Sequence, residues 1–166
     1  MKQERIFSFE PVWRSDAKLL ILGSMPSVES LRQGFYYAHP RNAFWPMLAD
    51  ILGEKLPSTI EEKKEMLISR RIALWDSAHS CERQGSLDSA IRAPRANDFE
   101  TLYQNCPGIS HVFFNGAAAY ELYRKLVARQ DEKRIFHRLP STSPAYTLKY
   151  ESKLEVWRQA RKEVLG

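Results

Sequence analysis

Cysteine is scarce in this chain, and the features of secreted and membrane proteins are missing. Cys81 and Cys106 are the only two cysteines, too few for the four thiolate ligands of an iron–sulfur cluster or a cysteine zinc site. The start, Met1–Arg5, is polar rather than signal-like, and no apolar run approaches the length that spans a bilayer. We therefore expect a reduced, cytoplasmic protein with no membrane segment, no metal and no other cofactor.

Acidic residues are outnumbered by basic ones. The 166 residues include 25 Lys and Arg against 20 Asp and Glu, which gives a formal net charge of +5 and a sequence pI of about 9.3. A basic chain favours a polyanionic partner such as nucleic acid, although many soluble proteins are equally basic. The length predicts a single domain over residues 1–166 that buries its own core.

Four short apolar runs alternate with helical patterns along the chain. The first run has no polar alternation, which is typical of strands covered on both faces of a parallel sheet. This alternation predicts an α/β fold, a three-layer α/β/α sandwich around a central four-stranded, mainly parallel sheet. The predicted strands are Lys18–Leu22, Arg71–Trp75, His111–Phe114 and Arg134–Leu139.

Helix starts are marked by capping signals. The segment Ser58–Glu62 contains overlapping capping-box spacings, and Asn97-Asp98 stands where a cap precedes a helix that closes at Pro107-Gly108. Further helices are predicted over about residues 43–52, from Gly116 onward, and from about Lys149 to Leu165.

Two small-residue loops follow predicted strands, at the edge where parallel sheets bind ligands. The first, Gly23-Ser24-Met25-Pro26-Ser27, precedes an aromatic stretch, Tyr36–Trp45. The second runs Leu139-Pro140-Ser141-Thr142-Ser143-Pro144-Ala145-Tyr146-Thr147. Together the loops resemble the paired motifs of the uracil-DNA glycosylase superfamily, most closely its hypoxanthine-DNA glycosylase branch.

This resemblance covers nearly the whole chain, including Gly85–Ser89, and implies a function in DNA base-excision repair. The implied enzyme flips a deaminated base, hypoxanthine in the first place, and hydrolyses its N-glycosidic bond with water. It acts on DNA as a monomer with no obligate protein partner. No lysine beside the motifs is obvious as a Schiff-base amine, so lyase chemistry is not expected. Three alternatives stay open: a uracil- or mismatch-specific glycosylase, a nucleic-acid-binding relative without catalysis, and a hydrolase of free nucleotides.

The residue that positions water in other branches is missing from the first loop. Gly23, Ser24 and Met25 are implied to contact the base, but Met25 stands in the place of a catalytic Asp or Asn, and a thioether cannot accept a proton. Asn42 matches the Asn that the hypoxanthine branch is held to use. An amide can orient water, which suffices when the base departs ahead of attack. The alternative role of Asn42 is to cap the helix that begins at Ala43.

Three more residues are candidates for the base pocket. Tyr37 stands where the superfamily stacks an aromatic ring on the flipped base; the alternative is a core tyrosine. Asp76, the second catalytic candidate, could accept a hydrogen bond from a purine N–H or act on the water, or could instead cap a helix. Asn115 precedes Gly116, and this turn could offer backbone amides to a phosphate or serve only as a tight turn.

The second loop is implied to grip the DNA backbone. Ser143 and Pro144 match the second superfamily motif, and a serine hydroxyl with adjacent backbone amides suits a flanking phosphate. Ala145 falls on the residue that intercalates, but it is too small to fill an emptied base stack, so Tyr146 is our hypothesis for the wedge. The predicted DNA-contacting residues are Ser27, Ser141, Ser143, Pro144, Ala145 and Tyr146.

The stretch Glu82–Arg95 has no clear period and predicts an exposed loop or a broken helix. Its Arg83, Arg92 and Arg95, together with Lys149, could run along a DNA strand. A solvated loop accounts for the same charges equally well.

Overall fold

A parallel four-stranded sheet forms the centre of the molecule, in a computed structural model that describes residues 4–127, 131 and 133–165. Its strand order is β3-β2-β6-β7, and all three pairings are parallel. Every residue of β2, β3 and β6 is buried, which explains why these runs lack polar alternation. The predicted α/β fold is confirmed. The strands are β2 (Leu19–Gly23), β3 (Ile72–Asp76), β6 (His111–Asn115) and β7 (Ile135–Leu139).

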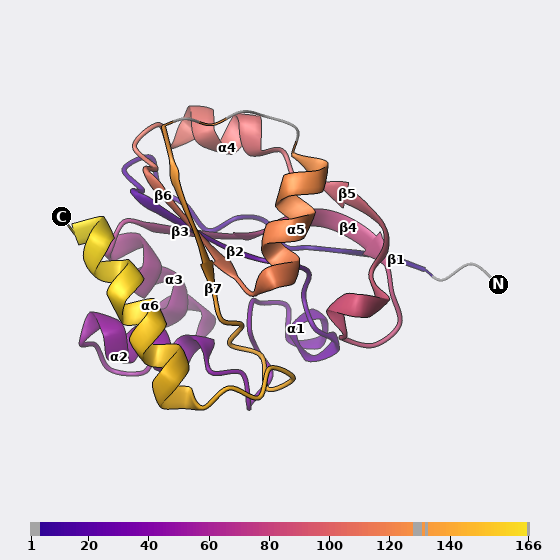
Figure 1. Cartoon of the computed structure of the whole chain (residues 1–166), viewed down its shortest axis with the longest axis horizontal. Coiled ribbons are helices and arrows are strands. Elements are labelled where there is room, and N and C mark those ends of the chain that lie inside the picture. The colour runs from indigo at the N-terminus through magenta and orange to yellow at the C-terminus, as the bar shows by residue number, and fades with distance from the viewer. Residues whose placement is uncertain (1–3, 128–130, 132, 166) are drawn as a thin grey trace.

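Helices cover both faces of this sheet (Figure 1). On one face, Trp157 of the last helix packs edge-on against Phe44 and Phe113. On the other, Phe114 packs against Tyr123. No helix in the described ranges is long and apolar enough to cross a bilayer. The first face carries α2 (Phe44–Leu52), α3 (Ile60–Ser69) and α6 (Tyr150–Leu165), and the second carries α4 (Phe99–Asn105) and α5 (Ala117–Leu126).

The predicted helix caps are formed. The Thr59 hydroxyl accepts from the Glu62 backbone N–H at 3.1 Å, and the Glu62 carboxylate accepts from the Ser58 N–H at 2.8 Å, so α3 begins with a capping box. The Asp98 carboxylate likewise accepts from the Thr101 N–H at the start of α4. These local contacts fix where both helices begin.

A second, antiparallel sheet was not expected. It has the order β1-β4-β5. The prediction of a loop or broken helix over Glu82–Arg95 is therefore wrong for Glu82, which ends β4, and for Arg92–Arg95, which lie in β5. Two register irregularities between β4 and β5 interrupt the alternation that would have marked a strand pair. Pro94 lies inside β5, which is an edge strand of this sheet, the position where proline is tolerated. The strands are β1 (Arg5–Phe7), β4 (Ala78–Glu82) and β5 (Arg92–Ala96), with a 3-10 turn at Asp88–Ala90.

Arg83 is not the solvated residue that its sequence context suggested. It is only 5% exposed, and its guanidinium donates to the backbone carbonyl of Pro26. Arg83 directly follows β4, which ends at Glu82. Arg83 therefore supports the first loop from behind, whereas Arg92 and Arg95 are exposed as expected.

The strand registers bring the ends of all four central strands to one edge. Gly23 pairs with Asp76 in the parallel β2/β3 ladder, and Asn115 pairs with Leu139 in the parallel β6/β7 ladder. Helix α1 (Val28–Gln33) begins just after the first of these ends, with Ser27 as its N-cap. The two loops named above therefore leave the same carboxyl edge of the sheet, from the strands on either side of β6, and this edge is the expected place for a ligand.

Candidate active site

A single cavity of about 260 Å³ lies at this edge, enclosed by both loops. Pockets for drug-sized ligands measure about 300–1,000 Å³, so this cavity suits a smaller group. It is lined by every predicted site residue except Tyr146, namely Gly23, Ser24, Met25, Ser27, Tyr37, Asn42, Asp76, Asn115, Ser141, Ser143, Pro144 and Ala145.

Asp76 is a buried carboxyl group at the end of β3. It is 3% exposed, and one of its oxygens accepts from the Ser8 hydroxyl at 2.7 Å. Burial raises the pKa of Asp76 to about 7, against the opposing effects of the Ser8 hydrogen bond and the Arg83 cation. The carboxyl therefore changes its charge near neutral pH. Such a perturbed group in a cleft is typical of functional sites.

Gly23 allows two polar groups to approach the backbone closely. A Cβ at this position would lie 2.6 Å from Oδ1 of Asp76 and 2.7 Å from the Tyr37 hydroxyl oxygen. Both separations are shorter than real Cβ contacts, so any larger residue would push these groups apart. Glycine is required here for the space that it leaves.

Tyr37 is held in an uncommon backbone conformation with φ of 53°. Its ring stacks on Phe44 with centroids 4.1 Å apart and an interplanar angle of 13°. The hydroxyl is buried beside Asp76 and Asn115 without a well-formed hydrogen bond to a described residue. Burial raises the pKa of Tyr37, so the hydroxyl stays protonated. The side chain thus combines a half-buried aromatic face with a buried donor.

Asn42 occupies both of the positions that the sequence offered. Helix α2 begins at Phe44, one residue later than expected, and its N-cap residue is Ala43. From the position before Ala43, Oδ1 of Asn42 accepts from the Phe44 backbone N–H at 3.0 Å and so satisfies the first amide of the helix. The same residue lines the cavity. The hydrogen bond uses one lone pair of the amide oxygen, and an amide oxygen has two. The capping contact therefore orients the side chain while leaving it an acceptor and both N–H donors.

Met25 lies at the boundary between the cavity and a small second core. Its side chain is buried in a cluster with Ala78 and Cys81, between the first loop and the antiparallel sheet. An apolar residue is favoured in this cluster because an unpaired polar group would lose its hydration there. The location accounts for a methionine where other branches carry a polar residue.

Asn115 holds the second loop against the sheet. Its Nδ2 donates to the Thr142 hydroxyl, and its Oδ1 accepts from the Thr142 N–H, both at 2.9 Å. The Gly116 N–H donates to the Leu139 carbonyl at 2.9 Å, so this amide is not free for a phosphate. Gly116 has φ of 99° and approaches Ser141 closely, and the tight-turn interpretation is the one that the structure supports.

The second loop has a buried root and an exposed tip. Thr142 is buried, and the Ser141 hydroxyl accepts from the Ser143 N–H at 3.1 Å. From Pro144 onward the loop is exposed, and Tyr146 is 46% exposed, with no contact to the cavity. The tip is therefore available for a surface partner, whereas the root belongs to the cavity wall.

Several polar residues that line the cavity were not among the predicted site residues, namely Ser30, His39, Ser86, Asp88 and Thr142. Asp88 accepts from the Ser24 hydroxyl at 2.6 Å. His39 accepts at Nδ1 from the Arg41 N–H at 3.1 Å, so its Nε2 carries the proton of the neutral ring. Asp88 lies in Gly85–Ser89, which was part of the family resemblance, and His39 lies in the aromatic stretch Tyr36–Trp45. Both residues could therefore have been predicted as site residues from the sequence.

Comparison with known proteins gives the family. A model described as the uracil DNA glycosylase superfamily matches residues 11–164. A protein of Methanosarcina barkeri named "Hypoxanthine DNA glycosylase" is 36% identical over 155 residues, which cover 93% of this chain and 96% of the relative. A protein of the same name from Methanosarcina acetivorans is 38% identical over 138 residues, covering 82% of this chain and 85% of the relative.

A solved structure agrees with these relatives. The solution structure of a Methanosarcina acetivorans protein, provisionally described as a uracil DNA glycosylase, superposes with a TM-score of 0.83 at 31% identity. The match covers 98% of this chain and 100% of that protein. With the paired loops around one cavity at the carboxyl edge of a parallel sheet, these similarities show that the chain belongs to the uracil-DNA glycosylase superfamily.

Proposed function

We propose that this chain is a monofunctional DNA glycosylase that excises a deaminated base, hypoxanthine before uracil or xanthine. The observation that carries the proposal is the convergence of both motif loops on one cavity of about 260 Å³, a size suited to a single flipped base rather than a whole nucleotide chain. The names of the two Methanosarcina relatives support hypoxanthine as the first substrate.

Base recognition is assigned to Asp76, Tyr37 and Gly23. The Asp76 carboxylate accepts a hydrogen bond from the N1–H of hypoxanthine, a proton that adenine lacks. In adenine, N1 carries a lone pair and would face the carboxylate as a second acceptor. Two buried acceptors without a donor between them are unfavourable, so the site should discriminate strongly against adenine. Tyr37 supplies the stacking face, backed by Phe44. Gly23 leaves the room in which these groups meet.

Asn42 is assigned to the attacking water. As the bond between C1′ and the base nitrogen breaks, its electron pair leaves with the base, and the sugar becomes an oxocarbenium-like centre. The water held by the Asn42 amide then bonds to C1′, and its proton passes to the departing base or to solvent. Asn42 needs only to orient this water, because the electrophile is already strong. The products are the free base and an abasic deoxyribose.

Water is the nucleophile in this proposal because the cavity wall contains no lysine among the described residues that line it. Lys153 of α6 contacts the second loop. Its ammonium is buried and donates to the Ser143 carbonyl at 3.1 Å, so it holds the loop. The residues of the described chain that line the cavity therefore offer no lysine amine that could form a Schiff base with the sugar in a lyase step.

DNA binding is assigned to the rim of the cavity. Ser27, Ser141 and Ser143 face a flanking phosphate, and Pro144, Ala145 and Tyr146 form the exposed tip that enters the emptied base stack. We further propose that the chain acts as one domain and as a monomer, without a cofactor, in the compartment that holds the DNA. The packing of α5 against both sheets supports the one-domain assignment.

Single-turnover cleavage of matched oligonucleotides tests the proposal. Duplexes containing hypoxanthine, uracil, xanthine or adenine at one position are compared, and free deoxyinosine is included. We expect hypoxanthine to be released fastest and adenine not at all. If uracil is released faster than hypoxanthine, uracil becomes the assigned substrate. Hydrolysis of free deoxyinosine as fast as hypoxanthine release from DNA would point to a nucleotide hydrolase. Binding without any cleavage would indicate a relative that has lost catalysis.

The salt dependence of binding separates a DNA enzyme from a small-molecule enzyme. Phosphate contacts release counterions, so the logarithm of the association constant should fall linearly with the logarithm of salt concentration. The expected slope is steep because the chain carries a net charge of +5 and must grip the backbone to flip a nucleotide. A flat plot would contradict the DNA assignment.

A further inference from the structure

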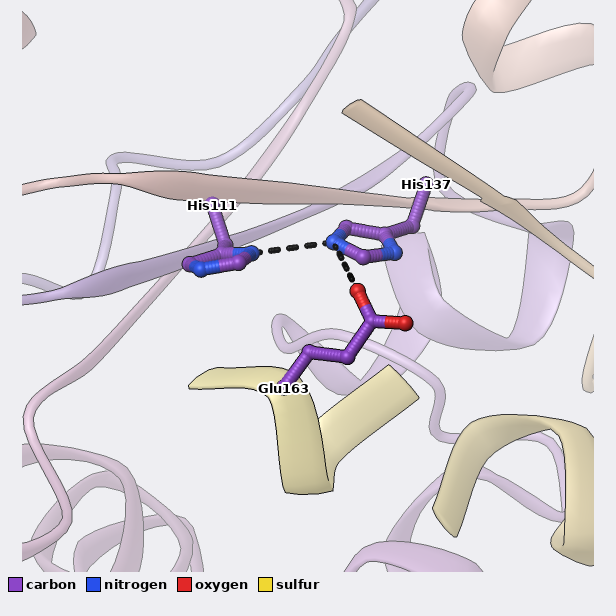
Figure 2. Close-up of side chains that lie close together, drawn as sticks. All are labelled: His111, His137 and Glu163. Carbon is purple, nitrogen blue, oxygen red and sulfur yellow. Dashed lines mark hydrogen bonds and ion pairs between the residues drawn. The ribbon is translucent and has the colours of Figure 1, made fainter. Parts of the chain in front are cut away.

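Three side chains with metal-ligating atoms meet at the edge of the sheet opposite the cavity. His111 is the first residue of β6, His137 lies in β7, and Glu163 lies in the last turn of α6 (Figure 2). Nδ1 of His111 and Nε2 of His137 are 2.9 Å apart, and Nε2 of His137 is 3.7 Å from Oε2 of Glu163. All three atoms lie within 4.8 Å of one another. None of these residues belongs to the proposed active site.

We propose that His111, His137 and Glu163 bind one divalent transition-metal ion, zinc being the ion that the ligand set fits best. Two imidazole nitrogens and one carboxylate oxygen are ordinary zinc ligands, and three protein ligands leave a fourth, tetrahedral position for water. Imidazole also suits copper and nickel, but hard oxygen-seeking ions such as Mg²⁺ and Ca²⁺ are disfavoured by two nitrogen ligands.

One cation can engage all three groups, whereas a proton shared by the two imidazoles engages only that pair. The carboxylate, 3.7 Å from Nε2 of His137, is then left to water. In a tetrahedral zinc site with bonds of about 2.0–2.2 Å, neighbouring ligand atoms are about 3.3 Å apart. Two of the observed separations, 2.9 and 3.7 Å, bracket that value, and the third pair of ligand atoms lies within 4.8 Å. The exposed Glu163 side chain would move toward the rings to complete the site.

The two rings are held in place by packing against their neighbours. His111 is 8% exposed, its ring stacks beside that of His137, and Phe113 packs edge-on against His137. The Glu163 side chain is 62% exposed, which leaves an entry path and room for a water ligand.

The location indicates a structural ion rather than one that takes part in base excision. The same helix that carries Glu163 holds the second loop near its other end, where the Trp157 indole N–H donates to the Pro140 carbonyl at 2.8 Å and Lys153 donates to Ser143. An ion bound at the last turn of α6 would fasten this helix to β6 and β7. The expected gain is in stability, because a metal that binds only the folded chain stabilises it by mass action.

Zinc titration of chelator-treated protein tests the site. Calorimetry with zinc chloride should give one ion per chain, and thermal unfolding should shift to higher temperature with added zinc. Co²⁺ as a spectroscopic substitute should produce the visible absorption of a tetrahedral site. His137→Ala and Glu163→Gln should each weaken zinc binding by at least about tenfold. Glu155→Gln, on the exposed surface of the same helix, is the matched control and should leave the affinity unchanged.

The absence of one-to-one zinc uptake by the parent protein would overturn the proposal. Glu163→Gln and His137→Ala variants that bind zinc as strongly as the parent protein would also overturn it. Glu163 is exposed, so its glutamine variant keeps the test decisive even where His137→Ala fails to fold. The rate of hypoxanthine release by the chelator-treated, metal-free protein, measured below its unfolding temperature, should match the rate of the zinc-loaded protein. Failure of the metal site would thus leave the proposed glycosylase function standing.

Discussion

The two loops that enclose the cavity differ in how far their side chains are removed from water. In the first loop region, the Tyr36 hydroxyl donates to the Glu10 carbonyl at 2.7 Å and the Trp45 indole donates to the Tyr36 carbonyl at 2.9 Å. In the second loop, only the root around Thr142 is buried, and the tip from Pro144 to Tyr146 is exposed. One loop is fixed by the core, and the other is presented to a partner.

This difference separates two tasks that a glycosylase must perform. Positioning a water and reading a base edge require groups held within a fraction of an ångström. Entering a DNA stack requires a side chain that protrudes from the surface. Substitutions in the buried region should therefore lower the rate of the chemical step. Substitutions in the exposed tip should affect the opening of the helix.

The largest effect is expected for Gly23→Ala. The added methyl group would meet Oδ1 of Asp76 and the Tyr37 hydroxyl at 2.6 and 2.7 Å, so both groups must move. A displacement of about 1 Å at a reacting centre costs about 100-fold in rate, and we expect a loss of that size in single-turnover cleavage. Gly108→Ala is the control, because its Cβ would meet only the Ala17 carbonyl at 3.4 Å, an ordinary contact. Comparable rates in Gly23→Ala and the parent protein would show that cleavage does not require the close approach of Asp76 and Tyr37 to Gly23.

Asn42→Ala should lower single-turnover cleavage by at least about tenfold, equivalent to about 1.4 kcal/mol in the barrier, while DNA affinity stays nearly unchanged. The substitution also removes a helix cap. Thr59→Ala, which removes the cap of α3 away from the cavity, controls for that loss of about 1 kcal/mol in stability. Cleavage that survives in Asn42→Ala would shift the water-activating role to Asp76.

A smaller and context-dependent effect is expected for Tyr146→Ala. Unstacking a base costs a few kcal/mol, and an inserted side chain offsets part of that cost. Cleavage in a stable base pair should fall, by less than about tenfold, whereas a mismatch or a single strand should be nearly unaffected. Equal losses on all three substrates would mean that Tyr146 supports the loop, for example through the Lys153 ammonium 5.3 Å from its ring centroid.

The central sheet could be predicted from sequence because three of its four strands, β2, β3 and β6, are covered on both faces. Full burial leaves an unbroken apolar run such as Leu19–Leu22, which stands out from the surrounding helices. The small antiparallel sheet could not be predicted for the opposite reason. Its β1 strand has only three residues, and β5 contains Pro94 and no clean alternation.

The candidate site was predictable where the chemistry is local and not where it depends on contacts between distant segments. Asn42 and Ser141 were found from loop motifs. The hydrogen bond between Ser24 and Asp88 joins residues 64 positions apart, and neither segment contains a sequence pattern that predicts it. The same holds for the burial of Arg83 beneath Pro26 and for the meeting of His111, His137 and Glu163. Such contacts follow from the packing of the whole fold.

The most direct test of the account is the pH dependence of single-turnover hypoxanthine release. Burial raises the pKa of Asp76 to about 7, and the ionised carboxylate is the form that accepts from the base N–H. The rate should therefore rise as the pH increases through about 7 and level off above it. Asp76→Asn should be slower and should lose this inflection. A flat profile for the parent protein, or the same inflection in Asp76→Asn, would contradict the assignment of Asp76 to the base.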